Sequence, residues 1–132
     1  MNNKIPEYEI KYSKIKNIYI QIKNGKIIVK APKRVGKKEI EKIVEQKTEW
    51  IQKTGLKPNK INIKQIKYAW GSCSSKKNIT LNLELIKYSQ QAIRYVILHE
   101  LCHLKYMNHS KDFWNLVEKY MPNYKQVKKE FK

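Results

Sequence analysis

The three histidines of this chain, His99, His103 and His109, all lie within one window of eleven residues. The first two belong to the run His-Glu-Leu-Cys-His, within a stretch from 90 to 107 that Ser89 can cap and that predicts a helix. Residues four apart lie on one helical face, so both imidazoles can reach the same ion. The six residues from His103 to His109 let the chain leave the helix, turn and bring back a third imidazole. The sequence therefore predicts a helix and a following turn that together place three imidazoles around one metal site.

Three nitrogen ligands leave one tetrahedral position for water, which distinguishes catalytic from structural zinc sites. We expect one Zn²⁺ per chain, which would lower the pKa of its water towards neutrality and polarise a substrate carbonyl. Glu100 stands between the first two ligands, where it would take the proton of the water and pass it to the leaving amine. The pattern predicts a zinc-dependent hydrolase, most directly a metallopeptidase with Glu100 as the general base.

The sequence leaves two features open around the metal helix, the predicted helix at 90–107 that carries His99 and His103. The oxyanion of a tetrahedral intermediate needs a hydrogen-bond donor, and the sequence does not choose among its candidates, which are Tyr106, Tyr124, Arg94 and Asn82. Metzincin-like sites have glycine where this chain has Tyr106, and Asn108 is the residue that can adopt a left-handed conformation instead. Ser110 then predicts the cap of a helix over 110–120. Asp112 suits the first turn of that helix, or alternatively a hydrogen bond to a ligand histidine.

The rest of the chain predicts a mixed set of strands and helices. Residues rich in β-branched and aromatic side chains predict strands at 8–12, 17–23 and 26–30, with a hairpin turn at Asn24-Gly25. Helical spacing of apolar residues predicts a helix from about 37 to 53, and Gly55 and Pro58 then mark a linker. Period-two alternation predicts strands at 61–66 and 79–85, with a turn-rich segment at 70–78 and a short basic helix at the end of the chain.

Composition limits the classes of protein that fit. The 132 residues suit a single domain, with strands and a helix in 1–54 and the zinc site in 55–132. The first ten residues lack the apolar block of a signal peptide, and no apolar run is long enough for a bilayer, so we expect a cytoplasmic protein without a membrane partner. Cys73 and Cys102 are too few for a disulfide framework, and we expect them to be reduced core residues.

The formal net charge of +18 comes almost wholly from lysine, because Arg34 and Arg94 are the only arginines. A protein that reads base edges would be expected to use more arginine, whose planar guanidinium pairs with guanine. A basic surface can still bind nucleic acid through its phosphates, so nucleic acid remains a secondary partner.

Four motifs together resemble the YgjP-like zinc metallopeptidase family, which is similar to the SprT and WLM domains. They are Trp70-Gly-Ser-Cys-Ser-Ser, Asn78-Ile-Thr-Leu-Asn, His99-Glu-Leu-Cys-His-Leu and Asn108-His-Ser-Lys-Asp-Phe-Trp. The resemblance implies an α+β, zincin-like metallopeptidase domain, with a small, mostly antiparallel sheet packed on the metal helix. It also implies that His99, His103 and His109 bind zinc and that Glu100 is catalytic. Family members are longer between the first helix and residue 56, so this chain is a short version.

The resemblance also directs attention to a substrate cleft. Zincin-like folds commonly hold an extended substrate on the edge strand beside the metal helix, and the predicted strand at 78–85 is our candidate. The expected substrate-binding residues are Asn82, Ser72, Ser74 and Tyr106. The family usually has a basic residue in place of Ala69 and often Trp-Arg in place of Leu83-Glu84, which puts the substrate preference in question.

Two other functions share these features. A metal hydroxide in a basic cleft can attack a phosphoanhydride, which would make the protein a nucleotide phosphohydrolase. A basic module that binds nucleic acid, with peptidase action on DNA-associated proteins, is the other alternative. The sequence leaves the oligomeric state open.

Overall fold

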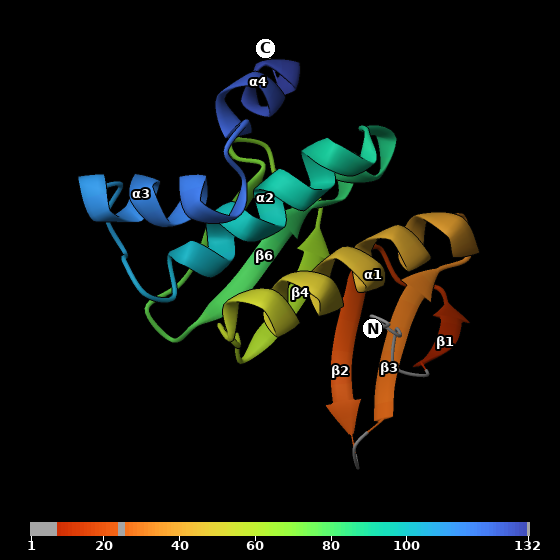
Figure 1. Cartoon of the computed structure of the whole chain (residues 1–132). Coiled ribbons are helices and arrows are strands. Elements are labelled where there is room, and N and C mark those ends of the chain that lie inside the picture. Colours follow the sequence, from red (N-terminus) through yellow and green to blue (C-terminus); the bar gives the residue numbers. More distant parts are fainter. Residues whose placement is uncertain (1–7, 24–25, 132) are drawn as a thin grey trace.

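The computed structural model describes residues 8–23 and 26–131, so the predicted Asn24-Gly25 turn lies outside the described residues. Six strands form one mixed sheet in the order β1-β3-β2-β4-β6-β5 (Figure 1). Their bounds are Tyr8–Ser13 (β1), Ile18–Lys23 (β2), Lys26–Pro32 (β3), Lys60–Lys64 (β4), Gly71–Cys73 (β5) and Asn78–Asn82 (β6). The β1–β3 and β4–β6 pairs are parallel and the other pairs are antiparallel, which confirms the predicted, mostly antiparallel sheet.

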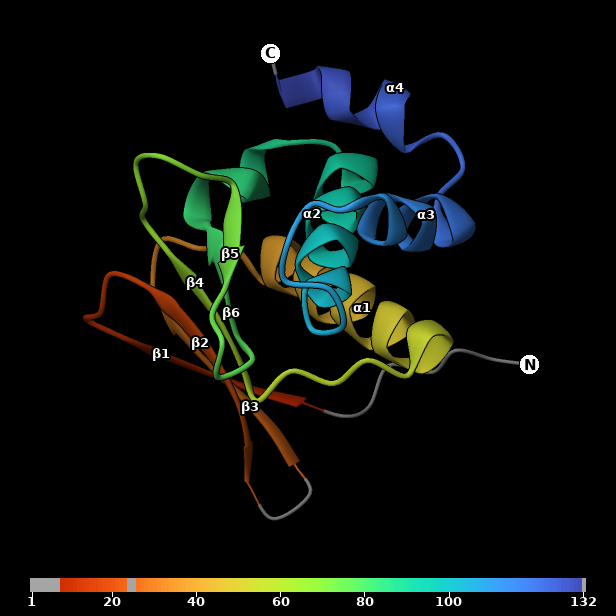
Figure 2. The same ribbon diagram turned by 90° about the vertical axis from the view of Figure 1, so that its left-hand side faces the viewer.

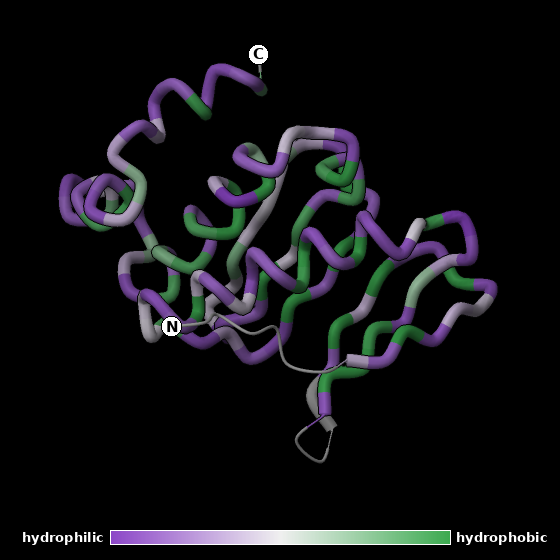
Figure 3. The backbone as a smooth tube through the Cα atoms, turned by 45° about the vertical axis from the view of Figure 1, so that its right-hand side comes forward, coloured by the Kyte–Doolittle hydropathy of each residue, from purple (hydrophilic) through white to green (hydrophobic). Residues whose placement is uncertain are grey.

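The helices cover one face of this sheet (Figure 2). Their bounds are Lys37–Thr54 (α1), Gln90–Cys102 (α2), Lys111–Tyr120 (α3) and Tyr124–Lys128 (α4), with 3₁₀ turns at Leu83–Lys87 (η1) and Lys129–Phe131 (η2). The pairing of β3, β2, β4 and β6 aligns a row of buried side chains beneath the helices. Figure 3 shows hydrophobic residues recurring along the strands of the sheet. The central members of this row are Val29, Ile20, Ile61 and Ile79. Alternation along each strand thus produces the apolar face on which the helices pack.

Helix α1 fixes the position of α2. Its predicted limits are close to the observed ones, because Gly55 ends it in a left-handed conformation with φ of 73° and an N–H bond to the Ile51 carbonyl. The Trp50 side chain is buried, and its indole Nε1 donates to the Arg94 carbonyl of α2 at 2.9 Å. This bond joins the two long helices above the sheet.

The structure corrects the predicted strand at 79–85. Strand β6 ends at Asn82 and the chain continues as the η1 turn, although Leu83 and Leu85 remain buried as the alternation suggested. The Asn82 side chain accepts a hydrogen bond from the Glu84 N–H at 2.9 Å, which starts the turn. Part of the turn-rich segment also forms a strand, since β5 pairs with β6 around a tight turn in which Lys77 has φ of 66°.

The segment after the metal helix differs from the prediction in two respects. Helix α2 ends at Cys102 rather than near 107, because the N–H groups of His103 and Leu104 bond three residues back, to the Glu100 and Leu101 carbonyls. The proposed left-handed role of Asn108 is wrong, since positive φ in the described parts of the chain occurs at Gly55 and Lys77. A tightened last helical turn therefore redirects the chain. In the described ranges no helix has the length and apolar character to cross a membrane.

Candidate metal centre and active site

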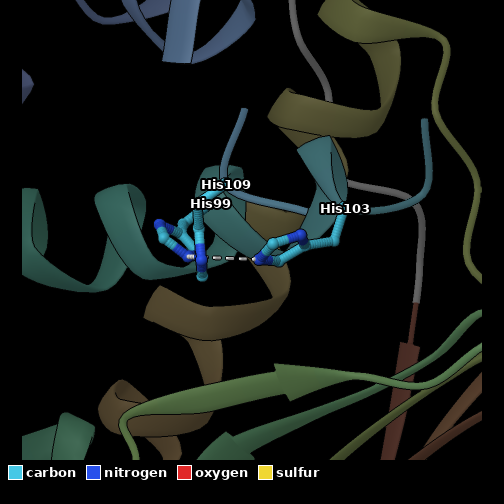
Figure 4. A group of neighbouring side chains, drawn as sticks. All are labelled: His99, His103 and His109. Carbon is cyan, nitrogen blue, oxygen red and sulfur yellow. Dashed lines mark hydrogen bonds between the residues drawn. The ribbon is translucent and has the colours of Figure 1, made fainter. Parts of the chain in front are cut away.

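The metal helix is positioned by its own cap and by burial. The Ser89 side chain accepts from the Ala92 N–H at 3.1 Å, as predicted, and starts α2. Apolar residues on most sides of α2 are buried, which fixes its rotation. His99 and His103 then lie one turn apart, and His109 reaches them from the connection to α3 (Figure 4).

The spacing of the imidazoles fits a tetrahedral zinc ion. His109 Nε2 lies 3.1 Å from His99 Nε2 and 3.1 Å from His103 Nε2. Two nitrogens held about 2.0–2.1 Å from zinc at a tetrahedral angle lie roughly 3.3–3.4 Å apart. The three ligand atoms all fall within 4.8 Å of one another, so the imidazoles form one cluster. The donor set and its geometry therefore suit the group that the sequence predicts.

Hydrogen bonds at the far side of two of the rings, those of His103 and His99, orient their Nε2 atoms. His103 Nδ1 lies 3.0 Å from the Tyr106 carbonyl, which can only accept, so the proton is assigned to Nδ1 and Nε2 keeps its lone pair. His99 Nδ1 lies 3.2 Å from the Tyr95 hydroxyl, which can serve His99 in the same way. Partners of this kind fix the tautomer and the ring orientation of metal-binding histidines.

Burial lowers the pKa of two of the histidines, His99 and His103. Desolvation, the neighbouring histidines and the charge of Lys128 lower the pKa of His99 to about 3. Desolvation also lowers the pKa of His103, in part opposed by its bond to the Tyr106 backbone. Metal ligands must be unprotonated, so both groups are ready for a cation at neutral pH without first losing a proton.

Aromatic rings from α3 support the cluster. The Ser110 hydroxyl accepts from the Phe113 N–H at 3.3 Å and starts α3, which confirms its predicted capping role. The Phe113 ring stacks on His103 with 4.4 Å between centroids, and the Trp114 ring stacks on His109 at 5.8 Å. These contacts restrict the ligand rings and exclude water from one side of the site.

Glu100 lies beside the ligands in a dry environment. Its side chain is buried, and desolvation raises its pKa to about 8. It packs on the backbone of β5: a Cβ placed on Gly71 would be 2.9 Å from both Cγ and Oε2 of Glu100. Only a glycine lets the strand come this close to the carboxyl group.

A cavity of about 730 Å³ opens beside His99 and Glu100. Residues from β5, α2, α3 and the C-terminal segment line it, and most of their side chains are aromatic or basic. The lining consists of Trp70, Gly71, Tyr95, Val96, His99, Glu100, Trp114, Tyr124, Lys125, Lys128, Lys129 and Phe131. The volume is typical of sites that bind small molecules or side chains, which range from about 300 to 1,000 Å³.

The edge strand beside this cavity is not the one that the sequence predicts. β6 pairs with β4 on one side and with β5 on the other, so it is an interior strand, and the edge belongs to β5. The prediction of 78–85 as the edge strand is wrong because Gly71–Cys73 pairs along its outer side. Ser72 lies on this edge strand and is exposed. Ser74 is exposed in the following turn, where its hydroxyl accepts from the Asn78 N–H at 3.2 Å.

The other expected site residues are divided between the cavity and the scaffold. Tyr124 lines the cavity, whereas Tyr106 contributes its carbonyl to His103. Asp112 is exposed in the first turn of α3. The Asn82 amide is engaged in the loop before β5, where Nδ2 donates to the Ile66 and Ala69 carbonyls at 3.0 and 2.9 Å.

Arg94 faces α1 instead of the metal centre. Its guanidinium contacts Glu49 Oε1 at 2.7 Å and Gln46 Oε1 at 3.3 Å, and it lies 4.2 Å from the Trp50 ring centroid. The bond to Arg94 is the main cause of the lowered pKa of Glu49. These contacts give Arg94 a role in holding the two helices together.

Three features of the site were not found from the sequence. The Tyr95 contact with His99 has a detectable signal, because the two residues are four apart on one helix. The approach of Gly71 to Glu100 and the return of Lys125, Lys128 and Lys129 to the cavity depend on tertiary packing alone.

A family model described as the YgjP-like metallopeptidase domain matches residues 16–54 and 52–132. The chain belongs to this family. The predicted resemblance is thereby confirmed, and the YgjP-like domain is a metallopeptidase-like hydrolase. Its two matched segments meet at the end of α1, where the sequence predicts a shortened middle region. No curated protein matches the sequence.

Two solved metallopeptidase zymogens have similar structures. Jannalysin of Methanocaldococcus jannaschii has a TM-score of 0.59 and 27% sequence identity, and the match covers 67% of this chain and 92% of that chain. Abylysin of Pyrococcus abyssi has a TM-score of 0.62 and 25% identity, with 67% and 90% of the two chains covered. These similarities confirm the predicted α+β, zincin-like fold of the YgjP-like domain.

Proposed function

We propose that the protein is a zinc metallopeptidase in which Glu100 is the general base. The observation that carries this proposal is a cluster of three imidazoles beside a buried carboxyl group and a cavity. In this cluster His109 Nε2 lies 3.1 Å from the Nε2 atoms of both His99 and His103. When bound, zinc supplies a Lewis acid that polarises a peptide carbonyl and acidifies a water. His99, His103 and His109 would hold it.

Glu100 has the environment that a general base needs. Its pKa of about 8 in the metal-free chain falls beside a cation, because an opposite charge favours the carboxylate. The group then takes up a proton near neutral pH and releases it to the departing amine nitrogen. Packing on Gly71 restricts the carboxyl group, so its orientation towards the cavity is set before substrate arrives.

The β5 edge is our candidate for holding the substrate. Its side away from β6 has no strand partner in the described sheet, and an extended peptide can pair with it through main-chain hydrogen bonds. Gly71 would then bring the paired backbone next to Glu100. Of the four oxyanion candidates, Tyr124 is the one that lines the cavity, and we retain it for this role.

Metal analysis combined with Glu100→Gln tests the proposal. The purified protein should bind about one zinc per chain, and Glu100→Gln should keep the metal while losing casein hydrolysis. His103→Ala should lose both. Glu118→Gln, which makes the same change at an exposed position on α3, is the matched control and should behave as wild type. A chain that does not bind zinc, or a Glu100→Gln variant with full activity, would contradict the proposal.

The same proteins separate the alternatives. A nucleotide phosphohydrolase would release phosphate or pyrophosphate in a Glu100-dependent manner and leave casein intact. A nucleic-acid-binding module would keep a salt-sensitive affinity for DNA in the His99→Ala variant. The nucleic-acid partner, the cytoplasmic location, the similarity to SprT domains and the single-domain organisation stay predictions.

A further inference from the structure

We propose that the cavity selects peptides in which acidic residues flank an aromatic one. This inference rests on the proposed peptidase function and names its substrate class. Two features of the cavity carry it: an aromatic lining next to the metal centre, and a cluster of lysines on the C-terminal segment, Lys125, Lys128 and Lys129.

The aromatic part of the cavity is preformed by contacts between distant segments. Trp114 stacks on Tyr124 with 5.3 Å between ring centroids. On the β5 side, the Trp70 ring lies 4.9 Å from Phe131 and 4.8 Å from Tyr88, both measured between centroids. Rings held in this way keep apolar surface available without first having to reorganise, which suits a large aromatic side chain.

The three lysines are exposed and lie along one short segment of α4 and η2. Lys128 Nζ is 4.8 Å from the centroid of Trp114, so this charge borders the aromatic lining directly. An acidic side chain beside a bound aromatic residue would meet these ammonium groups. Charge complementarity therefore favours an acidic peptide.

Nearby acids do not cancel this positive charge. Glu130 is the acid of the same segment, and its two carboxylate oxygens accept hydrogen bonds from Ser89, at 3.1 Å from the backbone N–H and 2.6 Å from the hydroxyl. Among the residues that line the cavity, Glu100 is the single acid, and it is buried at the metal centre. The lysines thus line the cavity as exposed side chains, with their charge available to a ligand.

A peptide suits this site better than a nucleic acid. The unpaired edge of β5 offers main-chain hydrogen bonds to an extended peptide, and it adjoins the cavity at Gly71. Nucleic acid has no peptide backbone to pair there. The cavity also contributes no arginine, the side chain that pairs with bases most specifically.

Binding to the zinc-loaded Glu100→Gln protein tests the inference without depending on turnover. The probes are rhodamine-labelled Ala-Glu-Glu-Phe-Glu-Glu-Ala and two relatives, one with glutamine for every glutamate and one with alanine for phenylalanine. Fluorescence anisotropy at physiological salt measures each Kd. We expect the first peptide to bind about tenfold more tightly than either relative. Each exposed ion pair changes affinity by up to about fivefold, which accounts for the glutamine relative. Burial of a phenylalanine side chain strengthens binding by about tenfold or more, which accounts for the alanine relative.

Charge reversal identifies the lysines responsible. The combined Lys125→Glu, Lys128→Glu and Lys129→Glu variant should lose the preference for glutamate over glutamine. A matched variant with Lys33→Glu, Lys37→Glu and Lys38→Glu changes the net charge equally at exposed positions outside the cavity, and it should keep the preference. Circular dichroism would show whether the charge-reversed variant of the C-terminal segment is folded. If it is not, the preference for glutamate over glutamine is measured in a variant with glutamine at the same three positions.

Three results would overturn the inference. The first is equal binding of the glutamate and glutamine peptides. The second is loss of the preference in both triple variants, which would indicate an effect of net charge alone. A twelve-nucleotide single strand that binds more tightly than the peptide, with a loss confined to the C-terminal lysine variant, would assign the surface to nucleic acid. Casein hydrolysis by the wild type is judged separately, so these failures are distinct from failure of the proposed function.

Discussion

Replacing Gly71 by alanine should lower the turnover number while leaving the metal in place. The new Cβ would lie 2.9 Å from Cγ and Oε2 of Glu100 and 3.1 Å from a methyl carbon of Val96. Ordinary contacts of this kind begin near 3.4 Å, so the Glu100 carboxyl group must move by about half an ångström. A displacement of 1 Å can cost about a hundredfold in rate, and we expect about a tenfold loss of kcat here.

The same substitution should have a modest effect on stability. Crowding in a packed interior costs about 1–3 kcal/mol. Gly71 is not in the left-handed region, so alanine also reduces the entropy of the unfolded chain, which offsets about 0.4–1 kcal/mol. The free energy of unfolding should therefore fall by no more than about 2.6 kcal/mol. The three histidines proposed to bind zinc lie outside β5, so the metal content should be unchanged.

Gly36→Ala is the matched control. A Cβ at Gly36 also meets a glutamate, Glu39, but at the end of a flexible side chain in the first turn of α1. Peptide hydrolysis, zinc content and urea denaturation would be measured for both variants beside the wild type. If Gly71→Ala keeps the wild-type kcat with zinc bound, the close packing of Glu100 on β5 does not position the base, and our reasoning is refuted.

Three further changes have defined outcomes. Tyr95→Phe removes the hydroxyl that contacts His99 Nδ1, so chelator competition should show a zinc affinity about 10–100-fold weaker; an unchanged affinity would mean that the contact does not orient the ligand. In the metal-free protein, folding raises the pKa of Glu100 to about 8, so between pH 4.5 and 8 the folded state binds more protons than the unfolded one. As pH rises through this range the unfolding free energy of the wild type should fall relative to that of Glu100→Gln. If urea denaturation gives the same difference between the two proteins at both ends of this range, the expectation is contradicted. Ser110→Ala deletes the acceptor for the Phe113 N–H and should cost about 1 kcal/mol in urea denaturation, whereas a loss below about 0.3 kcal/mol would remove the cap from the account.

Features set by neighbouring residues could be predicted from the sequence. Gly55 and Ser110 mark helix limits through their own conformation or side chain, and both positions were correct. The imidazoles of His99 and His103 share a face because helical spacing alone places them together. The general layout of the candidate site therefore depends on local rules.

Features set by distant residues could not be predicted. The Asn82 side chain starts the turn after β6 through Glu84, but its amide nitrogen is held by partners 13 and 16 residues earlier in the chain. The alternation of buried residues continued past this point, so periodicity gave no sign of the change from strand to 3₁₀ turn. The choice of β5 as the edge strand follows from the same loop.

The C-terminal segment shows most clearly which features cannot be predicted from the sequence. Its sequence predicts a short basic helix, which the structure confirms. Its place beside the cavity depends on Glu130 bonding to Ser89, 41 residues away, and on Phe131 packing against Trp70. Propensity cannot reveal contacts of this range, because the partners are brought together only by the completed fold.

The two edges of the sheet differ in their openness to a further strand. Unpaired strand edges invite association between chains, and charged residues on an edge strand discourage it. One edge strand is β1, which precedes the family match and carries exposed Glu9 and Lys11. The β5 edge consists of Gly71, Ser72 and Cys73, without a charge, next to Glu100. The sheet thus combines protection against aggregation at the β1 edge with an uncharged edge at β5 that can accept an added strand beside the proposed general base.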